Sequence, residues 1–131
     1  MHIVIVAPCL LPQAMTATGA TPPQLAMHLA ASTPVRHRVE IVDAVSRAFS
    51  RTTEADLYVL LWSHPFSPGL LEVAMQLTAC EPLVCIWDGP TAAPVDYLLE
   101  FCDYVICTIE STAWYQLLAT IEATQQEFAY P

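Results

Sequence analysis

Five short apolar runs, rich in β-branched residues, recur along the chain, and a stretch with helical spacing follows each of them. Buried strands of a parallel sheet have this continuous apolar character because helices cover both faces, and parallel neighbours need helical crossovers between them. The pattern therefore predicts a three-layer α/β fold of the (βα)5 type. The predicted strands are Ile3–Ala7, Val39–Val42, Leu57–Trp62, Leu83–Trp87 and Tyr104–Thr108.

Capping signals and apolar stripes between these runs predict the helices. We expect a Rossmann-like, specifically flavodoxin-like, strand order of 2-1-3-4-5, with residues 1–131 forming a single α/β domain. The helices are predicted at 22–32, after Asp43, after Ser67-Pro68, at 94–101 and from Ser111 onward, where Ser111 is the cap.

In a sheet of this kind, ligands bind outside the carboxyl ends of the strands, at the point where the strand order reverses. The predicted order places this reversal between the first and third strands, with the fourth strand beside them. Residues that directly follow these strands are therefore the candidate substrate-binding residues. They are Pro8, Cys9, Trp62, His64, Ser67, Gly69, Trp87 and Asp88.

Several of these candidates also have a plain structural interpretation. Trp62 and Trp87 end adjacent strands, where an indole stacks on a base, caps the core or fills an oligomer interface. Asp88 begins an Asp-Gly-Pro turn, and its carboxylate also suits a ribose hydroxyl. His64 is either an acid or ligand contact at the cleft edge or a solvated loop histidine. Glu72 near a helix N-terminus is either a catalytic carboxylate or a favourable partner of the helix dipole.

Three segments in the middle of the chain resemble the nucleoside 2-deoxyribosyltransferase-like family: 54–61, 67–72 and 81–86. In that family an Ala-Asp pair opens a central strand and a Gly-x-x-Glu turn supplies a nucleophilic glutamate. The resemblance implies that Glu72 attacks the anomeric carbon of a nucleoside or nucleotide, with Gly69 shaping the turn. The implied activity is cleavage or transfer at an N-glycosidic bond.

Two departures from the family pattern leave a second function open. Ala48 stands where the family usually has an aspartate, and the loop after the first strand, 7–12, lacks the family's glycines. Protonation of a leaving base needs a positioned acid. The alternative is therefore a non-catalytic binding or protein-interaction module, a degenerate relative of the enzymes.

A second resemblance comes from the ends of the chain. Residues 1–8, 18–20 and 37–42 resemble the start of the amino-terminal domain of GT-B glycosyltransferases, and 102–107 resembles a later strand of that domain. Those enzymes need a second Rossmann-like half to hold the sugar nucleotide. The resemblance therefore implies a partner subunit or a relic of such an enzyme.

The charge balance narrows the range of partners. The chain carries 13 carboxylates and four basic residues, all arginine, for a net charge of −9. Such a field repels a phosphate backbone, so we expect no nucleic-acid partner. The absence of lysine excludes a Walker lysine and a Schiff-base cofactor, and we expect no cofactor. The apolar fraction of 55% exceeds the usual value of about 45–50%, and we expect a homo-oligomer, most simply a dimer.

The five cysteines, at 9, 80, 85, 102 and 107, form no C-x-x-C pair, and we expect no signal peptide. An odd number of cysteines in this context favours reduced thiols in the cytoplasm. Cys85 and Cys107 fall inside predicted strands, where we expect small buried side chains. A nucleophilic Cys9 would need glycines or an arginine in its loop, and neither is present.

Membrane and metal binding are also not expected. No apolar run approaches the ~20 residues that span a bilayer. The four histidines lack the spacing of metal ligands.

Overall fold

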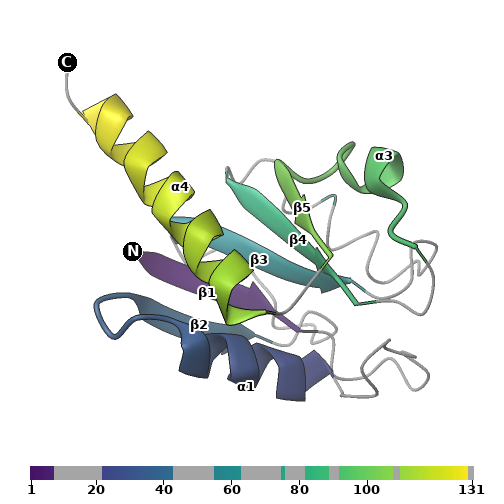
Figure 1. The fold of residues 1–131 in the computed structure, drawn as a ribbon, viewed down its shortest axis with the longest axis horizontal. Coiled ribbons are helices and arrows are strands. Elements are labelled where there is room, and N and C mark those ends of the chain that lie inside the picture. Colours follow the sequence, from purple (N-terminus) through teal and green to yellow (C-terminus); the bar gives the residue numbers. More distant parts are fainter. Residues whose placement is uncertain are drawn as a thin grey trace.

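The computed structural model describes residues 1–7, 22–42, 55–62, 75, 82–88, 92–107 and 110–129. Within these residues, five parallel strands form one sheet in the order β2-β1-β3-β4-β5 (Figure 1). This is the predicted order, and every predicted strand is present. The strands are β1 (His2–Val6), β2 (Arg38–Val42), β3 (Leu57–Trp62), β4 (Leu83–Trp87) and β5 (Tyr104–Ile106).

Alternate residues of the strands bury opposite faces of the sheet and give the molecule two cores. Every residue of β3 and β4 is buried, as expected for central strands with both faces covered. On one face Val59 and Ile86 pack beneath two long helices; on the other, Leu60 and Cys85 pack with Leu98. The pleat of the sheet thus divides each apolar run between two layers.

Helices α1 (Pro22–Ser32) and α4 (Ser111–Ala129) cover one face, and the short α3 (Val95–Leu98) lies on the other (Figure 1). The three-layer α/β prediction is therefore confirmed. Over residues 111–125 of α4 the buried side chains are Trp114, Leu118 and Ile121, spaced so that they form one stripe along the helix. The predicted helices after Asp43 and after Ser67-Pro68 lie outside the described residues.

The structure differs from the sequence prediction at one end of each of three elements, α3, α4 and β5. Helix α3 stops at Leu98 rather than Phe101, and Ser111 is the first residue of α4 rather than its cap. Strand β5 ends at Ile106, so Cys107 lies just beyond an edge strand and is exposed. The prediction of a buried Cys107 was wrong for that reason, whereas the prediction for Cys85 is confirmed. None of the helices in the described part of the chain has the length and apolar character needed to cross a membrane.

Candidate functional site

The carboxyl ends of β1, β3 and β4 lie at the same edge of the sheet. Trp62 and Trp87, the last residues of β3 and β4, are direct cross-strand partners. The backbone N–H of Asp88 then donates to the carbonyl of Trp62 at 3.1 Å. Strand β1 lies between β2 and β3, so the order of the strands reverses between β1 and β3. The carboxyl ends of these two strands lie at this edge. This is where a ligand site is expected in an open parallel sheet.

The two tryptophans lie beneath this edge rather than open to it. The Trp62 side chain is buried, and its ring contacts those of Tyr97 and Phe101, each with a centroid separation of 6.1 Å. Tyr97 and Phe101 also pack edge to face at 5.5 Å. Trp87 is only 4% exposed. A base would reach either indole only after the covering side chains had moved, so stacking by Trp62 or Trp87 stays a prediction.

Among the candidates that the structure describes, Asp88 is the one that is partly exposed at this edge. It follows β4 directly and is of intermediate exposure. Its backbone is fixed by the hydrogen bond to β3, which orients the residue relative to the strand-order reversal. A carboxylate held there suits the hydroxyl groups of a sugar, since an ionised carboxylate accepts hydrogen bonds only.

The remaining candidates lie outside the described residues, and their roles stay predictions. Strand β3 ends at the carboxyl edge and the parallel β4 begins at the amino edge, so the segment 63–82 joins the two edges. Glu72 belongs to that segment. The other candidates in this position are Pro8, Cys9, His64, Ser67 and Gly69.

At the opposite, amino edge, two aspartates make the same pair of hydrogen bonds. The Asp56 carboxylate accepts from the backbone N–H of His2 at 2.7 Å, and the Asp56 N–H donates to the His2 carbonyl at 2.8 Å. The Asp103 carboxylate accepts from the N–H of Leu83 at 2.8 Å, and its N–H donates to the Leu83 carbonyl at 2.8 Å. Each aspartate precedes a strand and joins it to the first residue of the neighbouring strand.

Comparison with known proteins adds no relative. No protein-family model matches this chain, and no curated protein matches it at a significant level. The resemblance to nucleoside 2-deoxyribosyltransferases therefore rests on the residues alone. One of these residues, Asp56 of the Ala-Asp pair, now has a structural reason to be present, because it joins β3 to β1. What remains of the resemblance is carried chiefly by Gly69 and Glu72.

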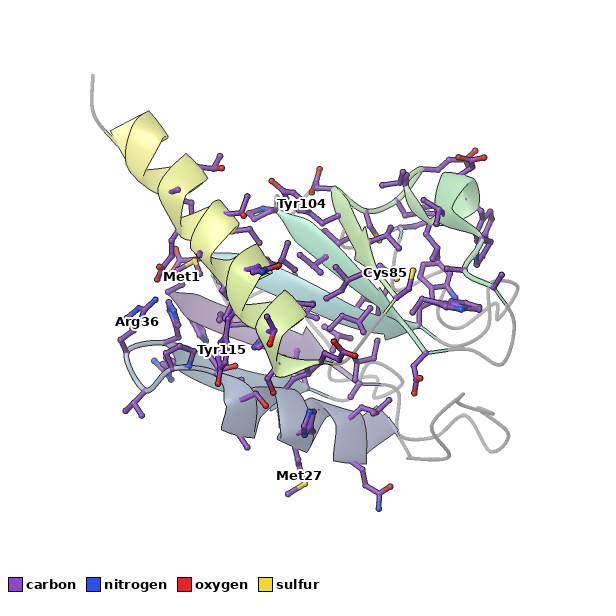
Figure 2. The ribbon with its side chains drawn as sticks, viewed as in Figure 1. Met1, Met27, Arg36, Cys85, Tyr104 and Tyr115 are labelled. Carbon is purple, nitrogen blue, oxygen red and sulfur yellow. The ribbon has the colours of Figure 1, made fainter. Side chains whose placement is uncertain are left out.

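A buried histidine at the amino edge is a feature that the sequence analysis missed. The His37 side chain is fully buried, and its Nδ1 lies 3.0 Å from the α-amino group of Met1. Its Nε2 lies 3.1 Å from Glu122 Oε1 without hydrogen-bond geometry. Arg36 donates to both oxygens of Glu122, at 3.4 and 3.2 Å. Figure 2 shows Met1 and Arg36 at the same end of the molecule. Glu122 is 85 residues from His37 in sequence, so a local sequence pattern could not predict this contact.

Burial and the neighbouring positive charges favour the neutral form of this histidine. Burial lowers the pKa of His37, and the positive Met1 amine lowers it further, against the opposing attraction of Glu122. An ammonium group only donates, so Nδ1 accepts from it and the neutral ring carries its proton on Nε2. The hydrogen bonds from Arg36 lower the pKa of Glu122. The cluster lies at the amino edge of the sheet, and its contacts join α4 to the residues that precede β1 and β2.

Among the described residues, no three His, Cys, Asp or Glu side chains are arranged to hold a metal ion. The closest approach to a reactive pair is Cys85 with Cys102. A hydrogen bond that the neutral Cys85 thiol makes to Cys102, together with burial, raises the pKa of Cys85 well above its ordinary value. A thiol held in its neutral form in this way is a poor nucleophile and a poor ligand.

Proposed function

We propose that this protein binds a nucleoside or nucleotide at the carboxyl edge of β1, β3 and β4 and cleaves or transfers its N-glycosidic bond. The observation that carries the proposal is the strand-order reversal between β1 and β3, with Asp88 held at the adjoining end of β4. The identity of the reaction rests on the resemblance around Gly69 and Glu72. These residues follow β3 in the chain, on the segment that leaves this edge.

In the proposed reaction the Glu72 carboxylate attacks the anomeric carbon of the sugar. The bond from that carbon to the base breaks, its electron pair leaves with the base, and the base takes up a proton. His64 is the candidate proton donor, and Asp88 is the candidate acceptor for a sugar hydroxyl. Water or a second base then attacks the glycosyl ester and releases Glu72. Water gives hydrolysis and a base gives transfer.

The proposal is tested by measuring release of free base from a panel of nucleosides and nucleoside monophosphates by chromatography. Glu72→Gln keeps the size of the side chain but removes the nucleophile, and turnover should fall on the order of 10⁴-fold with an unchanged melting temperature. The matched control is Glu100→Gln, an exposed glutamate in the turn after α3, which should retain full activity. Undiminished turnover in Glu72→Gln would refute the assignment, as would a parallel loss of activity and melting temperature.

A non-catalytic binding or interaction module is the second candidate, and one observation favours it. The rings of Tyr97 and Phe101 already pack against Trp62, the indole that a base would otherwise meet. On this account the edge is filled by the protein's own side chains. Substitutions at Glu72 would then leave every measured property unchanged, and no compound of the panel would be turned over.

A further inference from the structure

The outer surface of the α1/α4 layer is almost free of charge. Helix α1 contains no charged residue, and the first charged residue of α4 is Glu122, in the twelfth position of the helix. Over residues 24–32 of α1 the exposed residues are Gln24, Met27, His28 and Ala31. The exposed positions of α4 before Glu122 carry threonine, tyrosine, glutamine and alanine.

The other side of the molecule has the opposite character. Asp96 in α3, Glu100 in the following turn and Asp103 before β5 are all exposed, and all three are acidic. In a chain with a net charge of −9, one helical layer thus carries acidic side chains and the other carries none over most of its length. Val95 and Leu99 are also exposed on that side, at 42% and 49%, so the α1/α4 layer is distinguished by its lack of charge rather than by its exposed apolar side chains.

Two large apolar side chains project from the uncharged layer. Met27 of α1 is 66% exposed and Tyr115 of α4 is 46% exposed. Figure 2 shows Met27 pointing away from α1 on the side opposite the sheet. Methionine and tyrosine are enriched at protein interfaces, whereas charged residues are depleted at interface cores. The α1/α4 layer exposes a methionine and a tyrosine and has few charged residues, as such interfaces do.

The two helices also form one fixed surface. The Trp114 indole N–H donates to the Thr33 hydroxyl at 2.9 Å in a buried contact, and the Ser111 hydroxyl donates to that of Ser32 at 3.2 Å. These bonds join the start of α4 to the end of α1. A surface that is already ordered loses little conformational freedom when it binds.

We propose that the α1/α4 layer is the interface through which two copies of this chain form a two-fold dimer. The charge distribution selects a second copy over another partner. Two molecules of charge −9 repel each other, so they associate most readily through the face that carries no charge. A different partner would instead gain by complementing the acidic side near Asp96 and Glu100. This proposal is independent of the proposed enzymatic function.

A standard interface buries about 800 Å² on each partner, roughly a tenth of the accessible surface of 7434 Å². Helices of 11 and 19 residues are about 16 and 28 Å long. In a two-fold interface the same patch contacts itself, so α1 and α4 of one copy would pack against the same helices of the other.

The test is the molar mass in solution, measured by light scattering during size-exclusion chromatography at about 50 μM. The wild type should have twice the chain mass of 14.4 kDa. The double variant Met27→Glu/Tyr115→Glu places like charges across the two-fold axis and should have the mass of one chain. Both positions are exposed, so its circular dichroism should be unchanged. The matched control is Leu99→Glu, 49% exposed on the opposite layer, which should remain dimeric.

A wild type with the mass of one chain would overturn the proposal. A dimer that persists in the double variant, or that is lost in Leu99→Glu, would also overturn it by placing the interface elsewhere. Ala119→Glu gives a second disruption with a good helix former at an exposed position of α4. It should produce the same loss of mass if the double variant fails to fold.

Discussion

At the amino edge, individual aspartates join the starts of neighbouring strands through hydrogen bonds. Asp56 and Asp103 make equivalent pairs of hydrogen bonds, but the groups that they satisfy differ in burial. The N–H that Asp103 accepts belongs to the buried Leu83, whereas the contact of Asp56 with His2 is exposed. An unsatisfied N–H costs free energy only where water cannot replace the lost partner.

This difference predicts unequal effects of the same substitution. Asp103→Ala leaves the Leu83 N–H without its acceptor and should lower the free energy of unfolding by about 1–3 kcal/mol. Asp56→Ala exposes the His2 N–H to water and should cost less than about 1 kcal/mol. Urea denaturation of both variants measures the comparison. An Asp56→Ala variant that loses as much stability as Asp103→Ala would show that burial does not govern these contacts.

His37 predicts how stability depends on pH. Its pKa is lowered in the folded protein, so its contribution to stability is present above about pH 6.5, the ordinary value. That contribution is lost as the pH falls from 6.5 toward the lowered pKa, because the unfolded chain takes up the proton first. Glu122, whose pKa is also lowered, adds a separate loss below its ordinary value of 4.5.

The measurement is the free energy of unfolding at pH 7.5 and pH 5.5 for the wild type, His37→Asn and His28→Gln. The wild type should lose stability between the two values, and His37→Asn should lose less. His28 is exposed on α1, so His28→Gln should follow the wild type. Equal pH dependence in wild type and His37→Asn would remove His37 as the origin of the effect.

At the scale of elements, α1 and α4 are joined by a buried polar contact rather than by apolar packing alone. The Thr33 hydroxyl donates to the Leu29 carbonyl at 2.7 Å and accepts from the Trp114 indole. The hydroxyl therefore satisfies the end of α1 and the start of α4 at once. Both of these hydrogen bonds are buried.

Thr33→Val should therefore lower the free energy of unfolding by about 1–3 kcal/mol, because it leaves the Trp114 N–H buried and unpaired. Thr120→Val is the control. Its hydroxyl makes the same kind of bond to the carbonyl four residues earlier, but in an exposed position, and the change should stay within about 0.5 kcal/mol. A double-mutant cycle of Thr33→Val with Trp114→Phe should give a coupling energy of at least about 0.5 kcal/mol. Strictly additive losses would contradict the contact.

The strands were predictable from sequence, but the shape of the segment before β5 was not. Apolar runs with β-branched residues gave β3 and β4 to the residue, because central parallel strands are apolar on both faces. The helical spacing after Pro94 predicted a longer α3 than the structure has. After Leu98 the chain tightens: the N–H of Phe101 bonds to the Leu98 carbonyl, three residues back. This turn brings Phe101 against Trp62 and Asp103 to Leu83.

At the scale of the whole molecule, topology could locate the candidate site but could not supply its chemistry. The alternation of apolar runs and helices predicts a parallel sheet, and the flavodoxin-like strand order expected for it, which the structure has, places the candidate edge beside β1, β3 and β4. The burial of Trp62 depends on Tyr97 and Phe101, which are 35 and 39 residues away in sequence. A local sequence pattern cannot predict contacts between residues so far apart. The same limit applies to the cluster around His37, whose partners come from both ends of the chain.

The central claim is that the carboxyl edge binds a nucleoside or nucleotide, and a thermal-shift screen of the purified protein tests it most directly. A compound present at 100 times its dissociation constant stabilises the fold by about 2.7 kcal/mol. We predict that a nucleoside monophosphate raises the melting temperature of the wild type and of Glu100→Gln, and that Asp88→Asn weakens the shift. A flat response to every nucleoside, nucleotide and nucleotide sugar, or an undiminished shift in Asp88→Asn, would contradict the account.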